Sequence, residues 1–262
     1  MSKPAASPPP NIVAFAAFYV LVGLAFAAYL GRTLFAFPLL PFRLDDVNWC
    51  AAWLLTMVGD YYASSVCLCG VLIATDGPLR GGIWSALVLV LGSPWACAWT
   101  AIRLWTHRTL ACASAAPSKR PHDDFGAGQF VNAFVALYAI TGLAFAALLT
   151  RTLLAHPLFP FQLDDLGWSA AWLLTTVGDY YASSVCLCGV IVATDGPLRG
   201  GIWALLVLVL GSPWACAWTA IRLWTHHTLA LRLARVPAVR RLCSAAVRVA
   251  HPGQRRAGAA RV

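Results

Sequence analysis

The sequence predicts an all-α, polytopic membrane protein with six transmembrane helices arranged as two inverted three-helix repeats. Three observations predict this fold. Of the 262 residues, 60% are hydrophobic and 11% are charged, whereas a soluble domain carries roughly 45–50% apolar and about 25% charged residues. Six apolar runs are long enough to span a bilayer, and the second half of the chain repeats the first. This composition excludes a water-soluble globule, a disordered chain and a nucleic-acid reader with a charged face.

Each of the six apolar runs is predicted to span the membrane because of its length. The hydrocarbon core of a bilayer is about 30 Å thick, so a spanning helix needs roughly 20 apolar residues. The predicted spans lie near residues 12–31, 49–75, 83–105, 129–150, 168–194 and 202–224. The apolar segments 32–48 and 151–167 hold two prolines each, which excludes a continuous helix. They predict interfacial or re-entrant segments, with phenylalanines at the level of the lipid headgroups.

The chain is a duplication with an offset of 119 residues. Residues 45–110 align with residues 164–229 without a gap, and 57 of these 66 positions are identical. Each repeat has three predicted spans, which is an odd number, so the second repeat must enter the bilayer upside down. The sequence therefore predicts an inverted repeat about an axis in the membrane plane. The predicted segments are an N-terminal tail (1–11), repeat one (12–110), a polar linker (111–128), repeat two (129–229) and a basic tail (230–262).

The basic tail carries the charge excess of the protein. The net charge is +9, and residues 230–262 hold eight arginines and no acid. Because basic residues favour the cytosolic side of a membrane, both termini are predicted to be cytosolic. The tail either binds anionic lipid as a broken amphipathic helix or is a solvated tail that sets orientation only. The predicted partner is the lipid bilayer of an endomembrane or the plasma membrane; no nucleic acid is predicted, and a homo-oligomer is left open.

The main candidates for chemistry are two aspartates inside predicted spans. Asp60 lies eleven residues beyond Trp49, about 17 Å along a helix and so near the bilayer midplane. Asp179 is its equivalent in the second repeat. A carboxylate at this depth costs several kcal/mol unless it is protonated, hydrated or paired. Helical spacing and sequence adjacency bring polar neighbours to these acids: Thr56, Tyr61 and Ser64, and Thr175, Tyr180 and Ser183.

Two interpretations of the aspartates stay open. They are titratable groups on a proton or cation pathway, or they are protonated acids that hold helices together by hydrogen bonds. The sequence brings both acids to the repeat interface in either case.

A second candidate feature interrupts the third and sixth predicted spans. Gly92, Ser93 and Pro94 stand in the middle of one, and the same triplet recurs in the other as Gly211, Ser212 and Pro213. Proline removes a backbone hydrogen bond and clashes with the preceding turn, so a kink or an unwound turn is expected. Matching breaks in two repeats point to a transporter site with a hinge. The alternative is a packing kink without a ligand.

The remaining polar residues predict structural roles. The pairs Asp45-Asp46 and Asp164-Asp165 precede spans two and five, where they either cap the helices and interact with the helix dipole or form the mouth of a cation path. Two exposed ion pairs are expected in the short turns, Asp76 with Arg80 and Asp195 with Arg199. The cysteines of the two Cys-x-Cys motifs are expected to be small packing residues. Residues two apart lie on roughly opposite faces of a helix, so they cannot easily bind one metal. We predict no metal, no cofactor and no enzyme, since no haem-binding histidine and no catalytic set occurs in the spans.

The repeat unit resembles an uncharacterised plant family of multi-pass membrane proteins. That family has a tryptophan before an aspartate–aromatic pair, then an aromatic span, then a Gly-Ser pair. In repeat one these positions are Trp49 or Trp53, Asp60-Tyr61, Trp84 and Gly92-Ser93; in repeat two they are Trp168 or Trp172, Asp179-Tyr180, Trp203 and Gly211-Ser212. This chain departs from the pattern by the prolines that follow Gly-Ser. The resemblance implies a membrane protein and no particular activity.

Two functions are expected from these observations. The first is a transporter or channel-like protein for a small solute or ion, with the two aspartates as protonatable gates and the two breaks as hinges. The second is a structural or assembly subunit of a membrane complex, with dry, hydrogen-bonded aspartates and no transported substrate.

Overall fold

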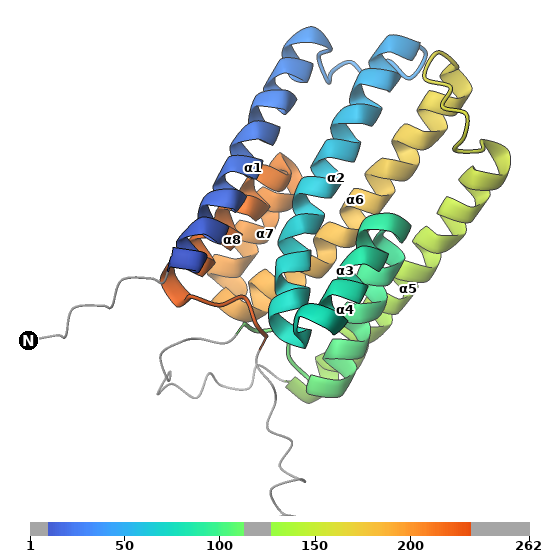
Figure 1. Cartoon of the computed structure of the whole chain (residues 1–262). Helices are drawn as coiled ribbons and strands as arrows, with labels where there is room; N and C mark the ends of the chain where they lie inside the picture. Colours follow the sequence, from blue (N-terminus) through green and yellow to red (C-terminus); the bar gives the residue numbers. More distant parts are fainter. Residues whose placement is uncertain (1–9, 113–126, 232–262) are drawn as a thin grey trace, which may run out of the picture. The chain divides into compact units, whose positions relative to one another are not determined.

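The protein is a helical bundle in which each repeat supplies four helices (Figure 1). The computed structural model describes residues 10–112 and 127–231, and these contain helices and no named strand. The bounds in repeat one are α1 Pro10–Ala36, α2 Val47–Asp76, α3 Pro78–Leu91 and α4 Ser93–His107; those in repeat two are α5 Ala127–Ala155, α6 Leu166–Asp195, α7 Pro197–Leu210 and α8 Ser212–His226. The predicted N-terminal tail, linker and basic tail lie largely outside the described residues.

Aspartates begin α2 and α6, as the sequence predicts. The Asp46 carboxylate accepts the backbone N–H of Asn48 at 2.9 Å, and that of Asp165 accepts the N–H of Trp168 at 3.1 Å. Each cap satisfies a donor that the first helical turn leaves without a partner. The proline-bearing segments before these caps are non-helical, and the indole of Trp49 holds one of them by donating to the Pro38 carbonyl at 3.0 Å.

Four helices are long and apolar enough to cross a membrane, namely α1, α2, α5 and α6. The prediction of six spanning helices is not confirmed. The third and sixth predicted spans are each divided into two short helices of 14 and 15 residues. A helix of this length covers only about 22 Å, less than the hydrocarbon core.

The chain reverses direction at each division, so α3 and α4 form a hairpin (Figure 1). The rings of Trp84 and Trp95 lie 6.0 Å apart, whereas eleven residues of continuous helix would separate them by about 16 Å. The Trp99 indole reaches back to the Asp76 carboxylate at the start of the hairpin, at 2.8 Å. The α7–α8 hairpin repeats both contacts. Each hairpin therefore enters and leaves at the same end of the bundle.

This reversal corrects the prediction of an inverted repeat. Contacts between α2 and α8 follow the chain in the same order, from Asp60 with Ser212 to Cys67 with Cys216, so these helices are parallel. The same holds for α6 and α4. Since α4 also runs parallel to α2 after two reversals, α2 and α6 point in one direction. The repeats are thus related by an axis along the helices, because each contributes two spans and one hairpin.

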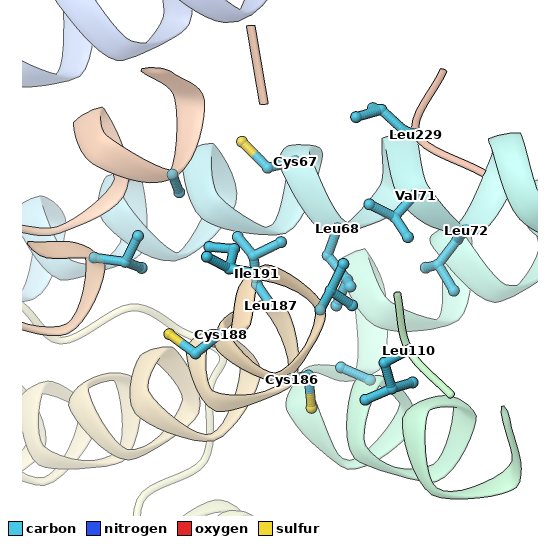
Figure 2. Close-up of a cluster of buried hydrophobic side chains, with 14 of the residues drawn as sticks. Cys67, Leu68, Val71, Leu72, Leu110, Cys186, Leu187, Cys188, Ile191 and Leu229 are labelled. Carbon is cyan, nitrogen blue, oxygen red and sulfur yellow. The ribbon is translucent and has the colours of Figure 1, made fainter. Parts of the chain in front are cut away.

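The core lies where α2 and α6 pack against each other (Figure 2). Leu68 and Leu72 of α2 and Leu187 and Ile191 of α6 are fully buried there. Burial of one such side chain contributes about 1.5–3 kcal/mol when the alternative is water. The outer faces of α1 and α5 instead expose large apolar side chains, such as Leu24 and Leu143. An apolar core with an equally apolar outer face is what a bilayer environment requires.

Candidate functional site

The two hairpin tips turn on glycines that no other residue replaces easily. Gly92 and Gly211 have φ angles of +84° and +86°, a region that disfavours residues with a Cβ atom. A Cβ on Gly211 would also lie 2.9 Å from a carboxylate oxygen of Asp60, and one on Gly92 would lie 3.0 Å from Asp179. Glycine is therefore required twice over, by the backbone and by the close approach of an acid.

The prolines that follow begin helices instead of kinking them. Pro94 and Pro213 are the second residues of α4 and α8. At this position a helix has no acceptor for the N–H, so proline costs little. The predicted mid-span kink is therefore a complete helix stop and restart.

The carboxylate of each repeat caps the hairpin of the other repeat. The backbone N–H of Ser212, at the start of α8, donates to Asp60 Oδ1 at 2.7 Å. The N–H of Ser93, at the start of α4, donates to Asp179 Oδ1 at 2.7 Å. Asp60 is buried within the bundle, and Asp179 is half-buried. A helix N-terminus carries a partial positive charge and unpaired N–H groups, so it favours an ionised carboxylate.

The tyrosine beside each aspartate binds the short helix that precedes the break in its own repeat. The Tyr61 hydroxyl donates to the Val88 carbonyl at 2.6 Å, and that of Tyr180 donates to the Val207 carbonyl at 2.7 Å. These carbonyls belong to the last turns of α3 and α7, and the tyrosine is in the same repeat as its acceptor. Two adjacent residues of α2 thus supply hydrogen bonds at two different breaks. Asp60 accepts from the N-terminus of α8, and Tyr61 donates to the last turn of α3.

The other predicted site residues do not join these contacts. The Thr56 hydroxyl lies 2.9 Å from the Ala52 carbonyl and from the Thr33 hydroxyl, and Ser64 donates to the Tyr61 carbonyl at 3.0 Å. Their equivalents in repeat two do the same: Thr175 contacts Ala171 and Thr152, and Ser183 donates to Tyr180. These hydroxyls bond to the backbone of their own helix, and the hydrogen bonds of the described residues join none of them to Asp60 or Asp179.

The two aspartates do not meet each other either. Each turns toward a hairpin of the opposite repeat, and the described residues show no hydrogen bond between the two acids. The site is therefore double. One half consists of Asp60, Gly211 and Ser212, and the other consists of Asp179, Gly92 and Ser93.

Sequence reasoning missed the contacts that close each hairpin at its base. Asp76 accepts from the Trp99 indole at 2.8 Å and pairs with Arg103 at 3.4 Å. Asp195 is paired in the same way with Trp218 and, at 4.0 Å, with Arg222. The expected pairs with Arg80 and Arg199 do not appear among the salt bridges of the described residues. Helix spacing could not reveal the true partner, because Arg103 comes near Asp76 only after the chain reverses.

Two surface hollows lie along α5. One is lined by residues that include Thr150 and Arg151, and the other by Phe145 of α5 and Tyr181 of α6. Neither is lined by Asp60 or Asp179.

Comparison with protein families, with curated proteins and with solved structures finds no match to this chain. The resemblance to the plant membrane family stays a prediction.

Proposed function

We propose that the protein is an integral membrane transporter or channel-like protein for a small solute or ion, in which Asp60 and Asp179 are protonatable latches. The observation that carries the proposal is the reciprocal capping of each hairpin tip by the opposite repeat. Non-helical backbone at membrane depth is tolerated where protein buries it or where it lines a water-filled path. Discontinuous helices with ends at the membrane interior are typical of transport sites.

Protonation supplies the switching step. An ionised carboxylate makes a charge-assisted hydrogen bond to the helix N-terminus, and such bonds contribute about 1.5–3 kcal/mol. A protonated carboxyl loses its charge and much of its attraction for the helix dipole. Each hairpin tip would then separate from the opposite repeat more easily. The freed N-terminus favours negative charge, so small anions are the first solutes to test.

The corrected topology also supports a cytosolic position for the hairpin bases. Five of the described arginines lie at the end of the bundle that holds the hairpin bases, and three lie at the opposite end. Leu231, the last described residue, donates its N–H to Thr75 at the first of these ends. Since basic residues concentrate on the cytosolic side, we propose that this end of the bundle faces the cytosol. The proposed location is an endomembrane or the plasma membrane.

The test is solute flux in vesicles that contain the purified protein. Halide, proton and monovalent-cation movement is followed at several pH values between roughly 5 and 8, because a change of pH can alter the charge of a buried carboxyl group. The variant Asp60→Asn with Asp179→Asn should remove the pH dependence of flux. The matched control is Asp45→Asn with Asp164→Asn, which removes two exposed acids outside the site. Wild-type flux equal to that of protein-free vesicles would reject the proposal.

One observation favours a second candidate, a structural or assembly subunit. Both carboxylates are occupied as helix caps, and the surface hollows described above do not reach them. In that case the Asp→Asn double variant would lower folding stability and recovery from membranes, while no variant would change flux.

A further inference from the structure

Four buried cysteines form two thiol pairs that join the repeats. The Cys67 and Cys216 sulfurs lie 3.6 Å apart, and so do those of Cys97 and Cys186. All four residues are fully buried. In each pair one thiol belongs to repeat one and its partner to repeat two. The two pairs are thus equivalent contacts, related to each other by the duplication.

The packing around each pair keeps the sulfurs together. Cys216 lies one helical turn beyond Ser212, next to the cap that aligns α8 with α2. A Cβ on Gly23 of α1 would lie 2.9 Å from the Cys216 Cβ, and Gly142 of α5 meets Cys97 in the same way. These glycines let the outer helices press against the thiol-bearing turns. Figure 2 shows Cys67 and Cys186 on opposite sides of the core, so the pairs are separate.

We propose that each pair is an oxidation site that closes into a disulfide between the repeats, with a peroxide as the oxidant. One thiol loses its proton, and the thiolate attacks the peroxide O–O bond to give a sulfenic acid and hydroxide. The hydroxide takes up that proton and leaves as one water. The partner thiol attacks the sulfenic sulfur, the S–S bond forms, and the hydroxyl leaves as a second water. The balance is two thiols and one hydrogen peroxide to one disulfide and two waters. The sulfurs must approach by about 1.5 Å, to the 2.05 Å of a disulfide.

The remaining cysteines of the two Cys-x-Cys motifs provide an internal comparison. Cys69 and Cys188 are also buried, yet their sulfurs contact the backbone carbonyls of Ser85 and Ala204 in their own repeat. Burial slows the reaction of a thiol, and it acts on all six. Only the four paired thiols have a sulfur partner in place when one of them is oxidised.

Closure of both pairs would fix each hairpin to the opposite repeat, next to its carboxylate cap. The bonds would join α2 to α8 and α4 to α6. This inference goes beyond the proposed function and does not depend on it, because its readout is covalent linkage and not flux.

The test uses the full chain with a specific protease site inserted between residues 113 and 126. Membranes are treated with hydrogen peroxide, free thiols are blocked, the chain is cut at the inserted site, and the products are separated in detergent without reductant. We expect the two halves to migrate together at the 28.1 kDa position of the whole chain, and to separate after reduction. Peptide mass spectrometry of the uncut natural chain should find Cys67 linked to Cys216 and Cys97 linked to Cys186.

Two matched variants decide the assignment. Cys67→Ala with Cys186→Ala removes one thiol from each pair and should leave the halves separate after peroxide. Cys69→Ala with Cys188→Ala removes two other buried thiols and should leave the linkage intact. Halves that separate in the wild type after peroxide, or that stay joined in the first variant, would overturn the proposal. The mass-spectrometric assignment keeps the test decisive if a variant fails to fold.

Discussion

The substitution Asp60→Ala tests whether the carboxylate cap holds the α8 hairpin in place. It removes the acceptor of the Ser212 N–H, which is 2.7 Å away in a fully buried residue. A buried donor without a partner costs about 1–3 kcal/mol. The lost attraction between the carboxylate and the helix dipole adds about 0.3–2 kcal/mol. We therefore expect the free energy of unfolding to fall by about 1–5 kcal/mol, which is the sum of these two terms.

The assay is reversible unfolding of the purified protein in mixed micelles, followed by tryptophan fluorescence. Asp60→Asn keeps an acceptor and loses the charge, so its stability should lie between wild type and Asp60→Ala. The equivalent change, Asp179→Ala, should cost the same amount, because its cap has the same length. The double variant should lose about the sum, since the two caps share no partner. A loss no larger than that of Asp45→Ala, at an exposed acid, would refute the reasoning.

Three further predictions use the same unfolding assay. Gly211→Ala should cost at least about 1–2 kcal/mol, because a Cβ disfavours its positive φ angle, whereas Gly201→Ala, in a helix with open space at this point, should be neutral or stabilising. Tyr61→Phe should cost about 1 kcal/mol through the lost bond to Val88, and Tyr62→Phe, at a half-exposed ring, should cost nothing measurable. Asp76→Asn should cost about 1–3 kcal/mol, because it leaves the buried Arg103 without its counter-charge; an unchanged stability would show that the pair does not hold the hairpin base.

Local features of this fold could be predicted from the sequence. The duplication is visible by alignment. The pair of acids before each apolar run predicts an N-cap, and the structure shows that Asp46 and Asp165 form these caps. The helical character of the apolar runs also follows from their length and composition. The sequence also indicates a matching interruption in each repeat and an acid inside one apolar run of each repeat.

The reversal at Gly92 could not be predicted from helix length alone. Residues 83–102 carry no charged side chain, so hydropathy gives no sign that the chain turns back at Gly92. The turn depends on a positive φ at Gly92 and on a cap from Asp179, a contact between residues 86 positions apart in sequence. One local signal was present. Glycine at a helix stop and proline near the next helix start together mark two helices, each too short to span.

The error in topology followed directly from that missed turn. Three spans per repeat required an inverted pair, whereas two spans and a hairpin require both repeats to run the same way. The contacts of Asp60 and Asp179 with the opposite hairpins depend on tertiary packing, which no spacing within one helix encodes.

The most direct test is labelling of single cysteines from either side of the membrane with a charged, impermeant maleimide. Leu79→Cys and Leu198→Cys report the two hairpin bases, where each leucine is 80% exposed. Phe42→Cys and Phe161→Cys report the opposite end of the bundle, at 65% and 61% exposure. Both leucine positions should be labelled from one side and both phenylalanine positions from the other. Labelling of Leu79→Cys and Leu198→Cys from opposite sides would contradict the hairpins and the parallel arrangement of the repeats.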